Sequence, residues 1–423
     1  MINTKNRRIF DDFSLKETEL DQKKKKYDSV SLGKQFPIAW HKAKNFNIYD
    51  KRDNKWIDMT SGIFVANAGH SNPKIKKAIK KQLDKNLIFS FLYNTEIRYD
   101  FIEKLLEISP DHFEKVVLLN SGSEITDIAY RLLKFWAKKN NKKYIVVFEG
   151  SYHGRTLGSD LMCGTKESTR WSNVEDDDII FLKFPYEEKD EFDPSKLPEP
   201  DKIAAFLLET YQGWGACMYP ENYIKDLYSF AREHGALVCF DEIQSGFYRM
   251  GTLYGYMTYG DYIKPDLICL GKGISSSLPM SALLGTKEII DVEKDTVVGG
   301  THSGNSLCCA ASLANLNFLT DETFQQKLEK RKKTFEKKCR ELKKHSSVKK
   351  INCKGMVCGI VFENEEVATS VVKRCVLNGV LPVFTGRNSI KLGPPLTITL
   401  AAIREALNVI SDCIEKVANE KHL

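Results

Sequence analysis

The sequence predicts an α/β protein with a large, mainly parallel seven-stranded sheet and a second, smaller α+β unit. Three observations lead to it: a length of 423 residues, seven short apolar runs that alternate with helical periods, and a lysine-rich change of texture after residue 310. A chain of this length exceeds one small core. Strands that alternate with helices are typical of a parallel sheet covered on both faces.

The expected strands of the large domain are short runs rich in Val, Ile, Leu and Phe. They span residues 116–119, 144–148, 179–182, 203–208, 236–240, 267–270 and 281–284. Between them, helical spacing is clearest after Ser121 and at 224–231, where Gly235 is a stop signal. An earlier amphipathic helix is expected to begin at Asn72-Pro73. Its apolar residues are Ile75, Ile79, Leu83 and Leu87.

We expect three segments along the chain. Residues 1–70 form an N-terminal arm and part of the small domain, 71–310 form the large domain, and 311–423 complete the small domain. A hairpin is predicted within 46–58. After residue 310 the pattern predicts a long helix over 321–344 and short strands within 354–362 and 389–392.

Composition excludes several classes of protein. With 42% hydrophobic and 28% charged residues the chain is neither fibrous nor disordered, and a net charge of +7 from scattered lysines does not indicate a nucleic-acid partner. No apolar run reaches the length of a membrane span, and the first residues are polar rather than signal-like. The eleven cysteines contain no Cys-x-x-Cys pair, so no metal site and no disulfide framework are expected. A reducing cytoplasm follows as the expected location.

The first candidate site is Ser121-Gly122-Ser123-Glu124, where an expected strand meets a helix. Ser121 and Glu124 have the spacing of a capping box, and a plain helix start would explain them. A helix N-terminus with two hydroxyls and a glycine is also suited to an anion such as a phosphate.

The second and third sites follow neighbouring strands. Asp241 stands at a strand end, where a carboxylate can cap a helix or hold a proton on a pyridine nitrogen, with Ile243 and Gln244 beside it. Lys272 lies between two glycines just beyond the next strand. Most lysines are solvated charges, but partial burial at a sheet edge would lower the pKa of this amine and make it nucleophilic.

Two polar turns complete the set. Tyr152 or His153, in the turn 151–156, is suited to lie flat on a heteroaromatic ring, and the Thr301 hydroxyl, in the turn 300–305, is suited to a phosphate oxygen. Each could be an ordinary turn when taken singly. The order of all five sites along the chain is what carries the functional prediction.

In that order the sequence resembles the class III aminotransferases that depend on pyridoxal phosphate (PLP), from about Phe36 to the C-terminus. The matching stretches are 121–124, 152–156, Glu209 with Gln212-Gly213, 241–246, Lys272-Gly273, 301–305 and 393–396. The resemblance implies the fold type I of PLP-dependent transferases. It also implies a homodimer with shared active sites and a transaminase of the EC 2.6.1 type.

The resemblance also implies a role for each matching residue. Lys272 would carry the cofactor as a Schiff base and act with Asp241 and Glu209 as the catalytic group. The cofactor-binding residues would be Ser121, Gly122, Ser123, Tyr152, His153, Asp241, Ile243, Gln244, Lys272 and Thr301, with Thr301 reaching the phosphate of the neighbouring subunit.

Two positions depart from the family's ω-amino-acid transaminases. Trp214 stands where those relatives commonly carry a second Glu, and Lys391 stands where they carry an Arg. Lys cannot reproduce the bidentate fork of Arg, and Trp cannot pair with a cation in the way that Glu does. We therefore expect Trp214 and Lys391 to contact an amine, keto or aldehyde substrate, with glutamate as donor and an ω-amino, amino-alcohol or sugar-like acceptor.

Three alternatives stay open at this point. Decarboxylation, racemisation or elimination would use the same Lys272 and Asp241, because the cofactor chemistry is shared. A non-catalytic binding protein would have no chemical reason to keep both. A dinucleotide-dependent oxidoreductase is weaker still, because no Gly-x-Gly-x-x-Gly turn follows an early strand.

Overall fold

The computed structural model describes residues 1–31, 35–90, 92–165, 174–293 and 298–420. Contacts between Cα atoms divide the chain into two compact units. Unit 1 comprises Met1–Asn72, Trp214–Ala216 and Glu322–Leu423, and unit 2 comprises Pro73–Gly213 and Cys217–Asp321. The boundary between the large domain and the C-terminal part of the small domain was expected at residue 310, which lies inside helix α9 (Ser306–Leu319). In the structure the division comes after the end of that helix, between Asp321 and Glu322.

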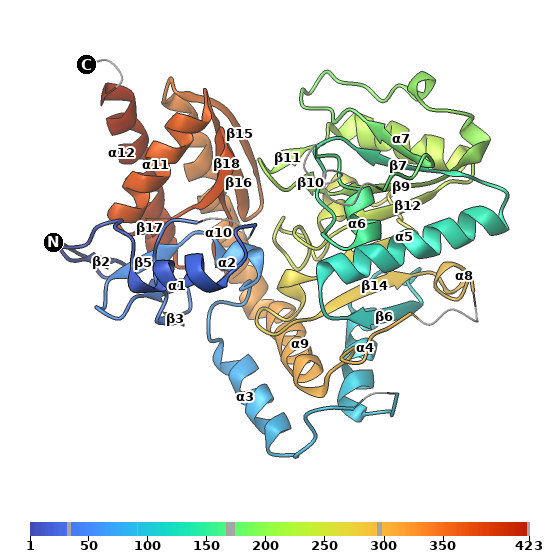
Figure 1. Ribbon diagram of the computed structural model, residues 1–423, viewed down its shortest axis with the longest axis horizontal. Helices are drawn as coiled ribbons and strands as arrows, with labels where there is room; N and C mark the ends of the chain where they lie inside the picture. Colours follow the sequence, from blue (N-terminus) through green and yellow to red (C-terminus); the bar gives the residue numbers. More distant parts are fainter. Residues whose placement is uncertain (32–34, 91, 166–173, 294–297, 421–423) are drawn as a thin grey trace. The chain divides into compact units, whose positions relative to one another are not determined.

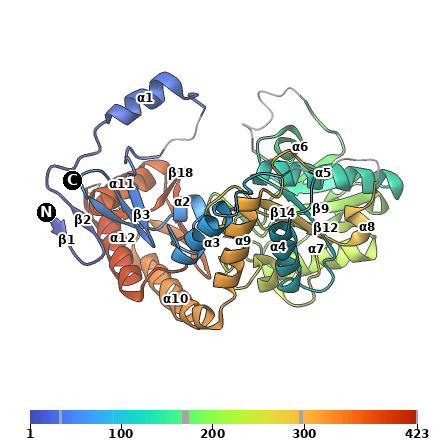
Figure 2. The same cartoon turned by 90° about the horizontal axis from the view of Figure 1, so that it is seen from below.

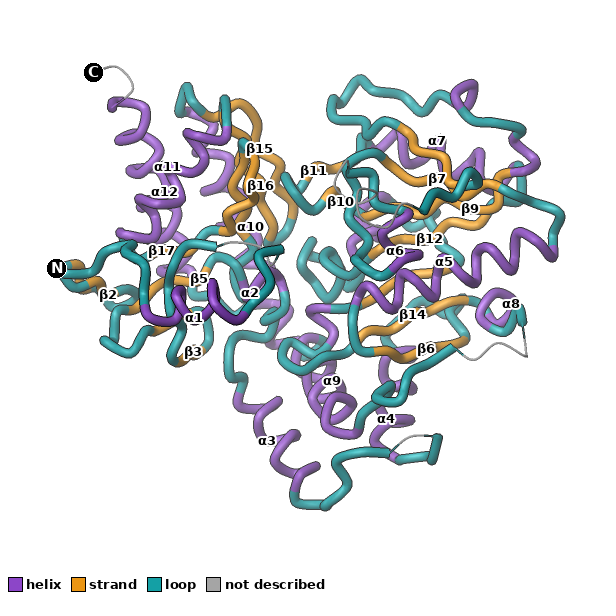
Figure 3. The backbone as a smooth tube through the Cα atoms, in the orientation of Figure 1, coloured by secondary structure: helices purple, strands orange, loops and turns teal. Residues whose placement is uncertain are grey.

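Unit 2 is built on a seven-stranded sheet with the order β6-β14-β13-β12-β9-β7-β8 (Figures 1 and 3). The strands are β6 (Lys115–Leu119), β7 (Tyr144–Phe148), β8 (Ile179–Leu182), β9 (Ile203–Glu209), β12 (Leu237–Asp241), β13 (Leu267–Leu270) and β14 (Ser281–Gly285). Only β14 runs against the others in this sheet, since its ladders with β13 and β6 are antiparallel. All seven strands lie within one residue of their predicted bounds, so the predicted mainly parallel sheet is confirmed.

The sheet is covered on both faces because its strands are apolar on both sides. Helix α5 (Gly122–Lys139) packs across β9, β13 and β14 (Figure 1). Alternate strand residues such as Leu207 and Cys269 join its hydrophobic core. The residues between them point to the other face of the sheet. There Phe206 packs against Phe230 of helix α7 (Glu221–Glu233), with ring centres 6.2 Å apart.

Unit 2 contains further helices and a short hairpin. The helices are α3 (Pro73–Leu83), α4 (Glu96–Glu107), α6 (Leu157–Leu161), α8 (Lys287–Ile290) and α9, and the hairpin pairs β10 (Tyr211–Gln212) with β11 (Cys217–Met218). Helix α3 packs along α9 (Figure 2). It begins at Pro73 as predicted but ends at Leu83, so the prediction that Leu87 belongs to its apolar stripe is wrong. Asn86 takes a left-handed φ of 57°, which a continuing helix does not allow.

Unit 1 joins both ends of the chain. Its N-terminal part contains β1 (Ile2–Asn3), β2 (Arg8–Ile9), α1 (Glu19–Tyr27), β3 (Lys42–Lys44), β4 (Asn47–Tyr49), β5 (Lys55–Asp58) and α2 (Ser61–Phe64). Its C-terminal part contains α10 (Glu322–Glu341), β15 (Val348–Lys354), β16 (Val357–Phe362), α11 (Glu365–Leu377), β17 (Val380–Leu381), β18 (Val383–Arg387), β19 (Ser389–Leu392) and α12 (Leu400–Glu420). Strands β15, β16, β19 and β18 form an antiparallel sheet, and β17 pairs with β5.

The sequence predicts only some of the elements of unit 1. The hairpin of β4 and β5, helix α10 and strands β16 and β19 were expected. Strand β15 was not, because its lysines hide the apolar alternation, and helices α11 and α12 were not identified either. Among the described residues, no helix combines the length and the apolar character that crossing a membrane requires.

Candidate active site

A cavity of about 160 Å³ lies in unit 2 at the carboxyl edge of the sheet. Glu209 ends β9 and Asp241 ends β12, and the two are directly paired in the parallel ladder of these strands. Lys272 follows the end of β13. The residues that line the cavity are Gly122, Ser123, Tyr152, His153, Gly154, Glu209, Tyr211, Asp241, Ile243, Gln244, Ser245 and Lys272. Sequence-distant side chains converge here because parallel strands end at one edge, the usual ligand site of open α/β sheets.

The start of α5 supplies one side of this cavity. Ser121 and Glu124 form the predicted capping box, in which the Glu124 N–H donates to Ser121 Oγ (3.3 Å) and the Ser121 N–H donates to Glu124 Oε2 (2.7 Å). Ser123 Oγ accepts from the Arg155 N–H at 3.0 Å, which joins the helix start to the turn that follows β7. The N-terminus of this 18-residue helix therefore faces the cavity with its positive dipole end, a setting that favours an anion.

Asp241 is held by two partners. Its Oδ1 accepts from the Ile243 N–H at 3.1 Å, and its Oδ2 lies 2.9 Å from His153 Nδ1. His153 is only 2% exposed, and its Nε2 has no hydrogen-bond partner among the described residues. His153 thus orients the carboxylate, whereas Tyr152, which is 49% exposed, is the freer aromatic side chain of the pair.

Glu209 connects two loops at the cavity. Its Oε2 accepts from the Tyr152 N–H at 3.1 Å and its Oε1 accepts from the Gly213 N–H at 3.2 Å. The carboxylate is buried, with 7% of the residue exposed. Glu209 therefore places a negative charge beside the cavity while it fixes the loop that carries Tyr152.

Lys272 is a half-buried amine in a short 3-10 turn with a left-handed φ of 41°. Burial lowers the pKa of Lys272, while the negative charges of Asp241 and Glu209 act in the opposite direction. Desolvation prevails, so a larger share of this amine is neutral near neutral pH than of an ordinary lysine. A neutral amine is the nucleophilic form, as the sequence predicted.

Ile243 fills the space between two glycines of the site. A Cβ on Gly122 would lie 2.9 Å from Ile243 Cδ1, and one on Gly271 would lie 3.1 Å from Ile243 Cγ2. Side chains at either position would force Ile243 to move, and Ile243 lines the cavity. The two glycines therefore keep the helix start and the lysine turn close to one apolar surface.

Three residues had no role assigned from the sequence. Tyr211 and Ser245 line the cavity; Tyr211 was signalled only by its proximity to Glu209, whereas Ser245, like Glu242, lies in the matching stretch 241–246. Glu242 is fully buried and accepts from four donors, which fixes the loop after β12. The donors are Thr210 Oγ1 (2.5 Å), Ser245 Oγ (2.8 Å), Gly255 N (2.7 Å) and Tyr256 N (2.6 Å).

Four predicted residues are not among those that line the cavity. Ser121 is the N-cap of α5, one residue before Gly122, which does line it. Thr301 is exposed in a turn of unit 2. Trp214 and Lys391 belong to unit 1, where the Arg387 guanidinium lies 5.2 Å from the centre of the Trp214 ring. Lys391 is 5% exposed, and its Nζ lies 4.7 Å from the centre of the Phe64 ring.

The residues around the cavity fit pyridoxal phosphate. The N-terminus of α5 with Ser123 suits the phosphate, the carboxylate of Asp241 suits a protonated ring nitrogen, and Lys272 suits the aldehyde carbon. The apolar side chain of Ile243 and the ring of Tyr152 suit the faces of an aromatic ring. The Nε2 atom of buried His153 has no hydrogen-bond partner among the described residues, so it can still form one hydrogen bond at the site.

Comparison with known proteins agrees with this fit. The family model described as "Aminotransferase class-III" matches residues 30–414. An acetylornithine aminotransferase of Clostridium acetobutylicum is 30% identical over 390 residues, which covers 90% of this chain and 97% of the relative. An isoleucine 2-epimerase of Lentilactobacillus buchneri is 28% identical over 432 residues, covering 95% of both chains.

The fold also matches solved structures. An ornithine aminotransferase of Toxoplasma gondii, described with partial PLP occupancy at its active site, superposes with a TM-score of 0.85. It is 24% identical, and the match covers 96% of this chain and 97% of that one. With the family model matching most of its length, the chain belongs to the class III aminotransferases and is a PLP-dependent transaminase.

Proposed function

We propose that this transaminase moves an amino group from glutamate to a keto or aldehyde acceptor of the ω-amino, amino-alcohol or sugar-like class. The observation that carries the proposal is a half-buried lysine at the end of β13, with the buried carboxylates Asp241 and Glu209 acting on its pKa. An acceptor whose terminal carbonyl becomes an amine is supported by the similar acetylornithine aminotransferase, whose name specifies a compound with an amine of that kind.

Each residue of the cavity has a role in this proposal. PLP, when bound, supplies an electron-withdrawing ring and a reactive aldehyde. Ser121, Gly122 and Ser123 bind its phosphate at the start of α5, Tyr152 and Ile243 pack on its ring, and Gln244 meets its phenolic oxygen. Asp241, oriented by His153, holds a proton on the ring nitrogen. Lys272 Nζ would hold the aldehyde carbon, and the same amine would serve as general base for the proton of the substrate Cα.

Glu209 is proposed to act with Lys272 and Asp241 in the catalytic group, and Trp214 and Lys391 are proposed to contact the substrate. Lys391 has the charge to bind a carboxylate or phosphate group. Trp214 offers a ring face of the kind that packs on hydrocarbon or sugar surfaces. The Arg387 guanidinium over that ring adds a second positive charge to unit 1 beside Trp214.

A homodimer in which Thr301 serves the neighbouring subunit's phosphate belongs to the same proposal. Exposed apolar side chains gather at Leu87, Ile88, Phe89, Leu92 and Tyr93. This segment contacts the loop of Thr301, since the Phe89 and His302 rings lie 5.4 Å apart and Asn305 Nδ2 donates to the Ile88 carbonyl at 3.0 Å. Apolar patches of this kind mark protein–protein contacts.

We also propose that the enzyme works in the cytoplasm. All eleven cysteines are free thiols in the structure, and thiols stay reduced in that compartment.

Racemisation is the second candidate, because a similar protein over 95% of its length is an isoleucine 2-epimerase. The same lysine would then return the proton to the carbon it came from. Analysis of products from L-amino acids separates the two reactions. A carbonyl product with conversion of the cofactor to its pyridoxamine form supports transamination, and a D-amino acid with unchanged cofactor supports epimerisation.

The central test is the bond to position 272. Borohydride reduction of the PLP-loaded protein, followed by peptide mass analysis, should find a phosphopyridoxyl group on Lys272. Lys272→Ala should still bind PLP noncovalently and lose turnover by about 10²–10⁴-fold or more, because the base is gone. Lys287→Ala, at the start of α8, is the matched control and should keep full activity. An adduct on another lysine, or full turnover of Lys272→Ala, would refute the assignment.

The variant Asp241→Asn tests the role of Asp241 at the ring nitrogen separately from the bond between PLP and Lys272. This variant should fold, accept PLP on Lys272 and transaminate far more slowly, because the amide does not hold the ring nitrogen protonated. The readouts are the adduct at Lys272 and single-turnover rates with glutamate.

A further inference from the structure

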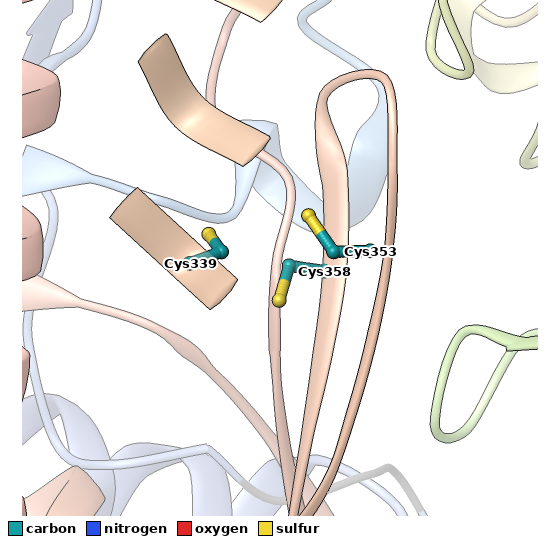
Figure 4. A group of neighbouring side chains, drawn as sticks. All are labelled: Cys339, Cys353 and Cys358. Atoms are coloured by element: carbon teal, nitrogen blue, oxygen red, sulfur yellow. The ribbon is translucent and has the colours of Figure 1, made fainter. Parts of the chain in front are cut away.

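Three cysteines of unit 1 bring their sulfur atoms together, and none of them is among the residues that line the amino-transfer cavity. Cys339 comes from α10, Cys353 from β15 and Cys358 from β16 (Figure 4). All three sulfur atoms lie within 4.8 Å of one another. The sequence did not indicate this group, because four residues separate Cys353 from Cys358 and Cys339 lies far upstream.

The fold holds these thiols in place from two directions. Cys353 and Cys358 are directly paired in the antiparallel ladder of β15 and β16, so their side chains lie on the same face. The hairpin turns at Gly355, whose φ is 65°. The Gly355 N–H donates to Glu336 Oε1 at 2.6 Å, and Glu336 lies one helical turn before Cys339. This bond ties the tip of the hairpin to the helix.

Mutual contact distinguishes the group from single core cysteines. Cys339 and Cys358 are fully buried and Cys353 is half-buried. Three thiols this close together can act on one ion, and the thiolate is the form that binds metal ions.

The spacing of the sulfur atoms suits a soft cation. Zn–S bonds of about 2.3 Å place tetrahedral thiolates about 3.8 Å apart, so small side-chain rotations would close the group around an ion. Thiolate ligands select Zn²⁺, Cd²⁺ or Cu⁺ over hard cations. Among the described residues no fourth ligand joins the three, which leaves one position for water.

We propose that Cys339, Cys353 and Cys358 form a three-thiolate site for a single thiophilic d¹⁰ cation of the Zn²⁺ class. Binding forms three metal–sulfur bonds and releases the protons that the thiols still carry. It changes no oxidation state. The site would stabilise the contact between α10 and the β15–β16 hairpin, since an ion that binds only folded protein favours the folded state.

Cd²⁺ is the probe for the test, because its thiolate complexes absorb in the near ultraviolet. The full-length, PLP-loaded protein is reduced, cleared of metal and titrated with Cd²⁺. We expect a sulfur-to-metal absorbance that saturates at a single equivalent and an ion that stays with the protein through gel filtration. Zn²⁺ should displace the signal.

Cys353→Ser is the test variant, because its half-buried position makes the serine tolerable. It should lose the absorbance and weaken Cd²⁺ binding at least about tenfold. Cys375→Ser is the matched control, since Cys375 and Cys413 are also buried neighbours in unit 1 but have no third ligand among the described residues. It should bind like the parent protein.

Three results would overturn the proposal. The first is a parent protein that retains no Cd²⁺, and the second is equal binding by the parent and Cys353→Ser. The third is a Cys353–Cys358 disulfide that persists through reduction and prevents metal uptake. Circular dichroism of both variants shows whether a loss of binding reflects a loss of fold.

Discussion

Lys272 stands under two opposing influences, burial that lowers the pKa of its amine and the two carboxylates Asp241 and Glu209 that raise it. The balance favours the neutral amine. Asp241 is also the carboxylate proposed to hold a proton on the ring nitrogen. A substitution of Asp241 therefore changes both the pKa of Lys272 and the protonation of the ring nitrogen.

We expect this balance to be measurable without cofactor. In PLP-free protein, reductive methylation followed by peptide mass analysis should show Lys272 half-modified at a lower pH than an ordinary lysine, whose pKa is about 10.4. Asp241→Asn should move the midpoint lower still, because the lost negative charge had stabilised the ammonium form. Lys134 is the internal reference. Burial lowers its pKa too, but hydrogen bonds to Asp178 and Asp176 outweigh burial and raise it. Half-modification of Lys272 and Lys134 at the same pH would contradict this expectation.

At the scale of elements, the start of α5 packs closely against the loop after β12. Gly122 and Gly271 approach Ile243 so closely that the helix start and the lysine turn share one apolar contact. The capping box at Ser121 fixes where the helix begins, and the hydrogen bond from Arg155 to Ser123 fixes the neighbouring turn. The proposed anion site is therefore a product of three loops rather than of the helix alone.

Gly122→Ala tests this arrangement. The new methyl group would push Ile243 Cδ1 from its position 2.9 Å away into the cavity it lines, and overpacking costs about 1–3 kcal/mol. We expect PLP affinity, measured by absorbance titration, to fall about tenfold or more. Ile243→Val in the same chain should restore much of it, because valine has no Cδ1. Equal PLP affinity in Gly122→Ala and the parent protein would show that Ile243 can move without reaching the cofactor.

At the scale of the whole molecule, the proposed dimer makes the active site a property of two chains. Thr301 is exposed and does not line the cavity of its own chain, while the segment beside it presents apolar side chains to the surface. An exposed hydroxyl in that setting has a function only if another molecule reaches it.

Hybrid dimers test that view directly. A hydrogen bond to a charged group contributes about 1.5–3 kcal/mol, so Thr301→Ala should weaken PLP binding about 10- to 100-fold. At limiting PLP, dimers of Thr301→Ala alone or of Lys272→Ala alone should be nearly inactive. Mixed dimers of the two chains contain one intact site and should recover up to about half of the parent activity per dimer.

The control for this experiment is Thr320→Ala, because the Thr320 hydroxyl donates to the Leu316 carbonyl within its own chain. That variant should keep the parent's PLP affinity. Inactive mixed dimers would show that Thr301 acts within its own subunit, and parent-like activity of Thr301→Ala dimers would show that it does not act at all. A monomer in sedimentation experiments would remove the shared site.

Local sequence patterns were sufficient for the large sheet and for most of the cavity. Apolar runs located all seven strands of the large sheet within a residue, because a strand buried on both faces needs nothing but apolar side chains. Parallel strands end at one edge, so the residues after those runs had to meet there. That is why the sequence alone predicts Asp241, Lys272 and the start of α5 as parts of one site.

Contacts between distant segments were decided only by the tertiary structure. The hydrogen bond of His153 to Asp241, the place of Ile243 between two glycines and the meeting of three thiols on α10, β15 and β16 each join segments with no local pattern in common. A periodic pattern reports which face of an element is buried. The side chain it meets there depends on how the elements pack, and packing is settled by the whole chain at once.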